Sequence, residues 1–165
     1  PTATVNGGLG LAAGNGDGAS LTTNNIRIET WFGFGIWCTQ GTPQYSHSFD
    51  ARSGGLYARG NGNFNDVYIR SDSRMKSGLV KVDNALARVS KITAYSYNKH
   101  KSISDHEIVG REVGIVAQEL QAVLPEAVNT AEDTTLTISN SAVTALLVEA
   151  IKELKQELDQ LKKGG

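Results

Sequence analysis

The stretch LVEAIKELKQELDQLKK, residues 147–163, carries the most regular pattern in this chain of 165 residues. Its aliphatic side chains recur at alternating intervals of four and three residues, at Leu147, Ile151, Leu154, Leu158 and Leu161. Such spacing, with charged residues and amides between, is typical of a coiled-coil seam. We predict a self-associating helix over about residues 140–163. The pattern does not decide between a two-stranded and a three-stranded coiled coil. The alternative is an amphipathic helix that packs against its own domain.

The residues before this helix, 71–139, predict a mixed α/β segment. Apolar residues at helical spacing predict a helix over 79–92, with Asp83 or Asn84 as its cap. Short strands are expected over 95–98, 112–116 and 136–139, with a polar loop or hairpin over 99–107. A further helix should begin at 117–120 and end near Pro125, because proline disfavours helical geometry in the residue before it. Ser139 or Asn140 is the expected cap of the last helix.

Residues 1–70 have a different character, since they hold 13 of the 18 glycines. Alternating residues at 26–29 and 67–70 predict strands, and the Gly, Asn and Asp clusters between them predict turns. Large aliphatic residues are too few for a single chain to form a hydrophobic core of its own, whereas WFGFGIW at 31–37 is strongly aromatic. We therefore expect an intertwined oligomer with a shared core; the alternative is a small monomeric β domain built on these aromatics. The whole chain is predicted to be α+β.

Composition excludes several classes of function. The net charge is −1, from 16 basic and 17 acidic residues, so neither nucleic acid nor an anionic membrane is an expected partner. No apolar run reaches the roughly 18 residues of a membrane span. Cys38 and the histidines His47, His100 and His106 lack metal-ligand spacing, so no metal or other cofactor is predicted. Because the first residue is proline, we expect a fragment of a longer chain.

A serine and a lysine lie at the boundary between the two compositions, in SDSRMK at residues 71–76. A neutral lysine amine can take the proton of a serine hydroxyl, whose oxygen then attacks a carbonyl carbon. Lys76 would need burial or a cationic neighbour, for which Arg74 is a candidate. The alternative is a solvated turn, since this spacing is common and no G-x-S-x-G motif accompanies it.

A second motif makes the sequence evidence more specific than SDSRMK alone. GIVAQEL at residues 114–120, followed by Pro125-Glu126, lies downstream of SDSRMK and upstream of the terminal coiled coil. In this order the two motifs resemble those of the C-terminal intramolecular chaperone domain of bacteriophage tail fibres, tail spikes and neck appendages. Endosialidase spikes and L-shaped tail fibres carry that domain, and myelin regulatory factor carries a related one. The resemblance covers residues 71–165.

The resemblance implies a homotrimeric chaperone that directs the folding of the preceding segment and then cuts itself off. It implies that Ser71 is the nucleophile, that Lys76 activates it, and that Asp72 and Arg74 support them. It favours cleavage of the Ser71–Asp72 bond, whereas attack on the carbonyl of Arg70 is chemically simpler and leaves Arg70–Ser71 open as the alternative bond. Residues 1–70 would then be the distal part of a virion tail fibre or spike and the client of the chaperone. Residues 71–165 would be released in the host cytoplasm.

Two other hypotheses remain at this point. In the first, residues 1–70 are a fibre tip for a bacterial surface receptor, contacted through Tyr45, His47, Tyr57 and Arg59, and residues 71–165 only oligomerise. In the second, the chain is a fragment of a transcription factor related to myelin regulatory factor. The absence of a basic region from the sequence argues against the second hypothesis.

Overall fold

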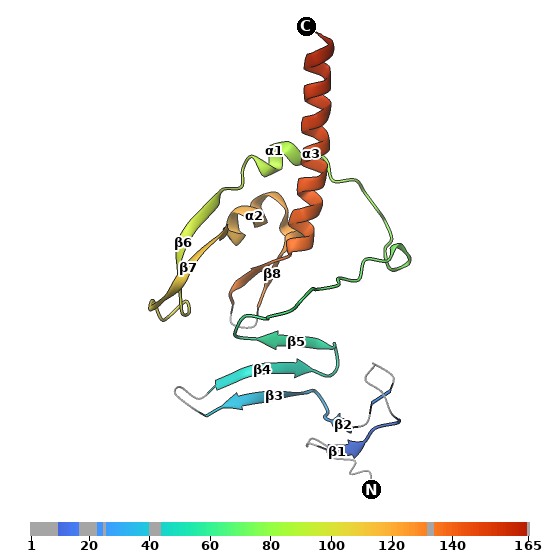
Figure 1. Cartoon of the computed structure of the whole chain (residues 1–165), viewed down its shortest axis with the longest axis vertical. Coiled ribbons are helices and arrows are strands. Elements are labelled where there is room, and N and C mark those ends of the chain that lie inside the picture. The colour runs from blue at the N-terminus through green and yellow to red at the C-terminus, as the bar shows by residue number, and fades with distance from the viewer. Residues whose placement is uncertain (1–9, 17–22, 25, 40–43, 132–133, 165) are drawn as a thin grey trace. The chain divides into compact units, whose positions relative to one another are not determined.

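The computed structural model describes residues 10–16, 23–24, 26–39, 44–131 and 134–164. The chain divides between Ser71 and Asp72 into two units (Figure 1). The described residues form antiparallel sheets and three α-helices, the last of which lies at the C-terminus. This confirms the predicted α+β class.

The first unit consists of short antiparallel strands. β1, Gly10–Ala13, pairs with β2, Ile26–Glu29, which confirms the strand predicted there. A three-stranded meander follows, made of β3 (Gly33–Cys38), β4 (Gln44–Asp50) and β5 (Gly55–Ala58). The strand predicted over 67–70 is wrong, because these residues pair with no other strand and all four are exposed. An alternating pattern alone does not make a strand when no neighbour supplies hydrogen bonds.

Aromatic pairs organise the three-stranded sheet without closing a core. The rings of Phe34 and Phe49 stack with centroids 4.5 Å apart, and Trp37 meets Tyr45 edge-on at 4.7 Å. A Cβ on Gly35 would lie 2.6 Å from a ring carbon of Tyr45, so only glycine lets that ring cover the strand. Among the described residues of this unit, none is buried. This argues against the monomeric β domain with an aromatic core of its own.

The second unit alternates helices with two hairpins. β6 (Ala94–His100) pairs with β7 (Ile108–Ile115), and β8 (Val128–Thr130) pairs with β9 (Leu136–Ile138), each pair antiparallel. The elements in chain order are η1 (Ser73–Met75), α1 (Ala85–Val89), β6 (Ala94–His100), β7 (Ile108–Ile115), α2 (Ala117–Val123), η2 (Pro125–Ala127), β8 (Val128–Thr130), β9 (Leu136–Ile138) and α3 (Asn140–Lys163).

A small core joins α1 to α3, which lie side by side about halfway along α3 (Figure 1). Ala85, Leu146 and Ala150 are buried at this contact, and the small alanines let the two helices approach closely. Partly buried apolar side chains pack around them, at Val82, Leu86, Val89, Ile92 and Leu124. Leu120 of α2 and Ala127 of η2 are also buried. The core of this unit therefore forms within a single chain.

Most of the elements predicted in residues 71–165 are confirmed. The strands at 95–98, 112–116 and 136–139 belong to β6, β7 and β9, and residues 101–107 link β6 to β7 as a hairpin. The helix expected from 117 is α2, and Leu124 follows its last residue, just before Pro125. Ser139 caps α3 by accepting a hydrogen bond from the amide of Ala142 at 3.3 Å. β8 was not predicted, since VNT carries no strand pattern.

The helix predicted over 79–92 is too long at both ends. Only Ala85–Val89 is α-helical, and Asn84 before it has a left-handed φ of 49°. The side chain of Asn84 makes no capping bond, and Asp83 accepts a hydrogen bond from Arg88 instead. The apolar spacing of 79–92 is real but only part of it is helical, because the left-handed turn at Asn84 interrupts the register.

Candidate cleavage site and assembly helix

SDSRMK folds as one turn of 3-10 helix, η1, held by the aspartate and arginine of the motif. Asp72 precedes η1 and accepts a hydrogen bond from the amide of Arg74 at 2.9 Å. The amides of Met75 and Lys76 donate to the carbonyls of Asp72 and Ser73, at 3.1 and 3.0 Å. Aspartate is a favoured residue at such a position, because its carboxylate satisfies an amide that has no partner within the turn.

The same carboxylate pairs with the guanidinium of Arg74. Nε of Arg74 donates to both oxygens of Asp72, at 3.0 and 3.1 Å, and Nη2 donates to Oδ2 at 2.6 Å. These bonds lower the pKa of Asp72 and raise the pKa of Arg74. Both residues were expected to support the dyad, which stays a prediction; their contacts in the single chain shape the turn. The charge of Arg74 is balanced by Asp72, which weakens it as the cationic neighbour suggested for Lys76.

The two predicted catalytic residues lie on either side of this turn in the sequence. Ser71 is the last residue of the first unit, and Lys76 is the C-terminal cap of η1 in the second. Both residues are exposed in the single chain, and each makes further interactions. Asp72, the residue after the favoured scissile bond, is therefore fixed by η1, whereas Arg70 of the alternative bond lies in the first unit.

The glutamate of the second motif, Glu119, accepts two hydrogen bonds from the chain before and within β6. The carboxylate of Glu119 in α2 accepts hydrogen bonds from the amide of Thr93 at 3.0 Å and from the hydroxyl of Tyr95 at 2.8 Å. The amide bond of Thr93, followed by the hydroxyl bond of Tyr95, lowers the pKa of Glu119. Leu120 beside it is buried. Glu119 therefore ties α2 to Thr93, just before β6, and to Tyr95 within β6 through two hydrogen bonds.

Two further glutamates, which sequence reasoning missed, connect α3 to the chain that follows η1. Glu153 accepts hydrogen bonds from the amides of Ala85 and Leu86, at 3.0 and 2.8 Å. Glu149 lies 3.4 Å from the amine of Lys81. In the sequence both glutamates look like the charged flank of a coiled coil. Only the helical offset of three to four residues from the buried Leu146 and Ala150 could have placed them on the inward face.

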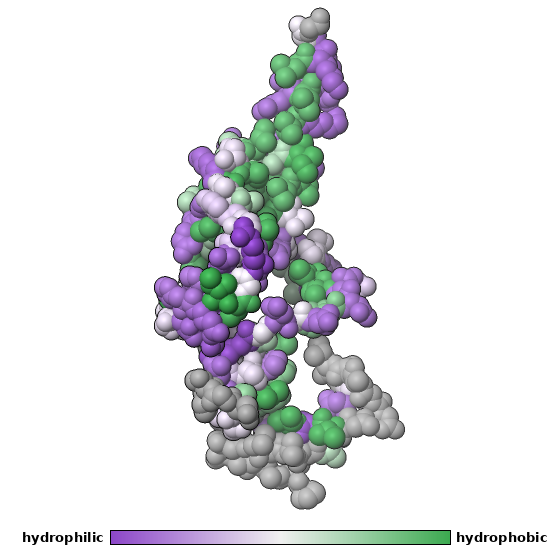
Figure 2. Space-filling view, turned by 60° about the vertical axis from the view of Figure 1, so that its left-hand side comes forward, coloured by the Kyte–Doolittle hydropathy of each residue, from purple (hydrophilic) through white to green (hydrophobic). Residues whose placement is uncertain are grey.

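The five seam residues form a separate face of α3. Leu147, Ile151, Leu154, Leu158 and Leu161 are exposed, with exposed fractions from 43% to 75%. Figure 2 shows apolar side chains along this helix with polar residues beside them. Leu146 and Ala150 are the residues that pack against α1, so the predicted seam is not the face that α3 uses within its own domain. A single chain therefore leaves the seam available to a partner.

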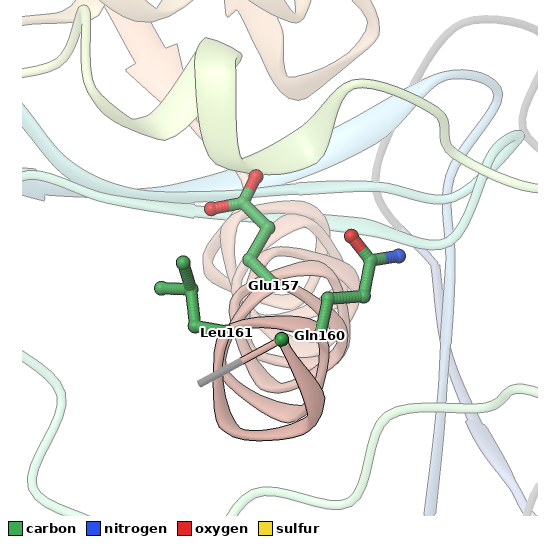
Figure 3. Close-up of a pocket in the computed structure, with 4 residues that line it drawn as sticks. Glu157, Gln160 and Leu161 are labelled. Carbon is green, nitrogen blue, oxygen red and sulfur yellow. The ribbon is translucent and has the colours of Figure 1, made fainter.

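The end of α3 has a shallow depression lined by Glu157, Gln160, Leu161 and Gly164 (Figure 3). These four residues belong to the last turns of the helix or directly follow it, and the side chains of Glu157, Gln160 and Leu161 point away from its axis. Such an open surface gives little enclosure to a small ligand.

The residues suggested for receptor contact lie on neighbouring strands of the first unit. Tyr45, His47 and Tyr57 are exposed on β4 and β5, and Nε of Arg59 donates to the carbonyl of Tyr45 at 2.8 Å. His100 and His106 stack at 4.9 Å in the β6–β7 hairpin. Within the described ranges, no group of three or more metal-ligating side chains comes together. The part of the chain that the structure describes also has no helix that is long and apolar enough to cross a membrane.

Residues 71–129 match the protein-family model Peptidase_S74, chaperone of endosialidase. This segment of the chain is therefore similar to the chaperone-of-endosialidase family. The resemblance drawn from the two motifs is thereby confirmed, and the match begins at Ser71 and includes both motifs. The family is one of peptidases, and autoproteolysis is its general activity.

Known proteins similar to the chain include phage fibre proteins. The long tail fiber protein Gp37 of Enterobacteria phage M1 is 51% identical over 113 residues, which cover 66% of this chain and 45% of that protein. Gp37 of Enterobacteria phage T2 is 45% identical over 117 residues, covering 68% of this chain and 9% of the relative. The myelin gene regulatory factor-like A protein of Dictyostelium discoideum is 30% identical over 112 residues, covering 58% and 12%. The aligned parts therefore make up less than half of each of these relatives.

Proposed function

We propose that residues 71–165 are a trimerisation chaperone that directs assembly of a phage tail fibre and then releases itself by cutting beside Ser71. The observation that carries the proposal is the family match, which starts at Ser71, the first residue of the motif. The similarity to tail fibre proteins supports residues 1–70 as part of the mature fibre in the virion, where a bacterial surface receptor is the partner. The chaperone part is released in the host cytoplasm.

In this proposal Ser71 and Lys76 carry the chemistry. The amine of Lys76 takes the proton from Oγ of Ser71, and Oγ attacks a neighbouring carbonyl carbon. For the bond between Arg70 and Ser71, Oγ attacks the carbonyl of Arg70, the C–N bond breaks, and the proton passes to the leaving nitrogen. Water then hydrolyses the ester to give the Arg70 carboxylate and a free Ser71 hydroxyl. Cleavage of Ser71–Asp72, which the family resemblance favours, instead requires attack on the carbonyl carbon of Ser71 itself. The proton passes to the leaving nitrogen of Asp72, and water completes the hydrolysis, so that Ser71 ends in a carboxylate and Asp72 becomes the new N-terminus.

Assembly supplies what the single chain lacks for this chemistry. Lys76 is exposed in the single chain, and a base needs an unprotonated amine, which burial favours over exposure. The exposed seam of α3 would bring three chains together, and with them three cleavage segments. Cleavage would then follow trimerisation, once in each chain, without any separate substrate.

The test uses the full chain and two substitutions. Ser71→Ala removes the nucleophile and should give an uncut chain that still assembles, because cutting follows folding. Lys76→Met removes the amine but keeps a stem of similar length, and it should also block cutting. Intact-mass spectrometry of the purified proteins detects either result. Cleavage of the Ser71→Ala chain beside residue 71 would show that the nucleophile is another group.

A matched control and the fragment masses complete this experiment. Ser73→Ala changes a serine two residues away, inside η1, and should cut at the normal rate. The new N-terminus of the wild-type C-terminal fragment, Ser71 or Asp72, identifies the scissile bond. If wild-type chains that have formed trimers remain uncut, the autoproteolysis proposal is wrong. The alternative that residues 71–165 only oligomerise the chain would then be favoured.

A further inference from the structure

The chain between the cleavage motif and α1 has few contacts that fix its path. It is not helical from Ser77 to Asn84, and Leu79 and Val80 are exposed, Val80 by 89%. Two anchors to α3 follow: the ion pair of Lys81 with Glu149, and the hydrogen bonds of the first amides of α1 with Glu153. Val82 and α1 also pack against the small core on α3, and the two glutamates supply the polar contacts between this segment and the helix.

Glu153 is the stronger of the two anchors. The first amides of a helix have no partner within it, and the side chain of Asn84, next to α1, makes no capping bond. Glu153 satisfies two of these amides with its two oxygens, at 3.0 and 2.8 Å. Hydrogen bonds to a carboxylate are stronger than neutral ones, and a negative charge is favoured at a helix N-terminus. The lysine pair is longer, and its amine is exposed.

The position of Glu153 on α3 links its contact with α1 to the exposed seam. It lies between Ile151 and Leu154, two residues of the exposed seam, and on the face that carries the buried Leu146 and Ala150. Figure 1 shows that α3 continues well beyond α1, and Glu153 is the residue of α3 that binds the first amides of α1. Any partner that fixes the seam also fixes the carboxylate that holds α1.

We propose that Glu153 is a positioning residue for self-cleavage, because it attaches the start of α1, and the chain leading back to Lys76, to the helix that carries the assembly seam. The inference rests on the proposed autoproteolysis. It makes α3 responsible for two steps: the seam brings the chains together, and Glu153 transmits that fixed geometry to the cleavage segment. Glu153 contacts no reacting atom.

The test compares three variants of the full chain. Glu153→Ala removes both acceptors and should slow cutting of the assembled trimer by at least about tenfold, the factor expected when a charge-assisted contact that orders the reacting segment is lost. Glu153→Gln keeps one carbonyl oxygen and should restore part of the rate. Glu157→Ala is the control, since Glu157 is exposed one turn further along the same helix (Figure 3), and it should cut at the wild-type rate.

A local measurement separates positioning from general destabilisation. In the uncut Ser71→Ala background, adding Glu153→Ala should accelerate hydrogen exchange at the amides of Ala85 and Leu86, whereas Glu157→Ala should not. Unchanged exchange at both amides would overturn the capping contact. Normal cutting by an assembled Glu153→Ala chain would overturn the positioning role, even if exchange is faster.

Two remaining outcomes also decide the inference. If both Glu153 variants fail to assemble, the residue is needed for folding rather than for positioning, and the inference is wrong. If assembled wild-type chains do not cut, the proposed autoproteolysis fails and the inference fails with it. Normal wild-type cutting together with normal cutting by Glu153→Ala would instead overturn the inference alone.

Discussion

The two units of the chain differ in what a single copy can bury. In the second unit Leu120 and Leu146 are shielded almost completely from solvent, and the contact between α1 and α3 forms a core. In the described part of the first unit no side chain reaches that state, and Trp31 remains 64% exposed. Burial of apolar surface is the main favourable term in folding, so the two units need different amounts of help.

This difference matches the division of labour in the proposed function. A domain with a core of its own can fold within one chain and present the seam of α3 to other copies. Strands that share a core between chains must first meet, which makes their folding slow and exposes them to aggregation. Linking the strands to an assembled domain raises their effective concentration. In the proposed function, cutting afterwards would remove the assembly domain and leave the fibre trapped in its assembled state.

The largest effect should come from removing the second unit altogether. Residues 1–70 expressed alone should be mostly insoluble or unfolded, because no side chain is buried in the part of this segment that the structure describes. The same residues made as part of the full chain and then cut should remain a trimer that resists heat and detergent, since dissociation requires the chains to unwind from one another. Soluble yield and mass by light scattering, compared for the two preparations, measure the effect.

The two preparations contain the same residues 1–70 and differ only in whether residues 71–165 were attached while the segment folded. Expression of residues 71–165 alone is the matched control, and it should give soluble, folded protein because its core lies within one chain. Residues 1–70 made alone that reach the same trimer in comparable yield would contradict the chaperone proposal, and the second unit would then be a removable tag.

A smaller but still severe effect should follow from breaking the seam. Replacing Leu154 and Leu158 with aspartate would force carboxylates against one another at the centre of a coiled coil, where an unpaired charge is strongly unfavourable. The chain should remain folded around α1 and α3, yet lose the trimer and fail to cut. Light scattering and intact mass report the two losses separately.

The control for the seam places the same charges on another face of the helix. Gln156 and Gln160 lie outside the seam and are exposed, so the double aspartate variant should assemble and cut normally. Efficient cutting by a demonstrated monomer of the Leu154→Asp, Leu158→Asp chain would separate assembly from cleavage. That result would contradict the order of events proposed above.

Much of the second unit could be predicted because its local signals agree with its tertiary structure. Pro125 ends α2, Ser139 caps α3, and the alternating residues of β6 and β7 form a hairpin. The secondary-structure prediction failed where tertiary contacts override the local sequence pattern. The helix expected over 79–92 begins only at Ala85, since Asn84 is left-handed and the cap comes from Glu153, distant in sequence.

The candidate site was predictable as a motif but not as a set of contacts. The spacing of SDSRMK located the turn, yet the pairing of Arg74 with Asp72 could not be read from it, because either residue was equally able to face Lys76. Glu149 and Glu153 are two among many charges on α3. What distinguishes them is their phase relative to Leu146 and Ala150, which becomes visible only when the face that meets α1 is known.

The smallest effect should be a loss of stability of the second unit in acid. The pKa of Glu119 is lowered by the amide of Thr93, that of Glu149 by Lys152, and that of Glu153 by the amide of Leu86, each below the ordinary glutamate value of 4.5.

A carboxylate with a lowered pKa in the folded state stabilises fully above its unfolded pKa, and the contribution disappears as pH falls through the folded pKa. Unfolding of the second unit by denaturant should therefore need less denaturant as pH falls below 4.5, with a modest change because solvent screens these groups. Both tryptophans, Trp31 and Trp37, lie in the first unit, so circular dichroism of the helices follows the second unit while tryptophan fluorescence follows the first. Glu119→Gln removes one titrating group and should flatten the acid dependence of the helical signal alone. An equally steep dependence in this variant would show that its hydrogen bonds with Thr93 and Tyr95 do not stabilise the fold through the charged form.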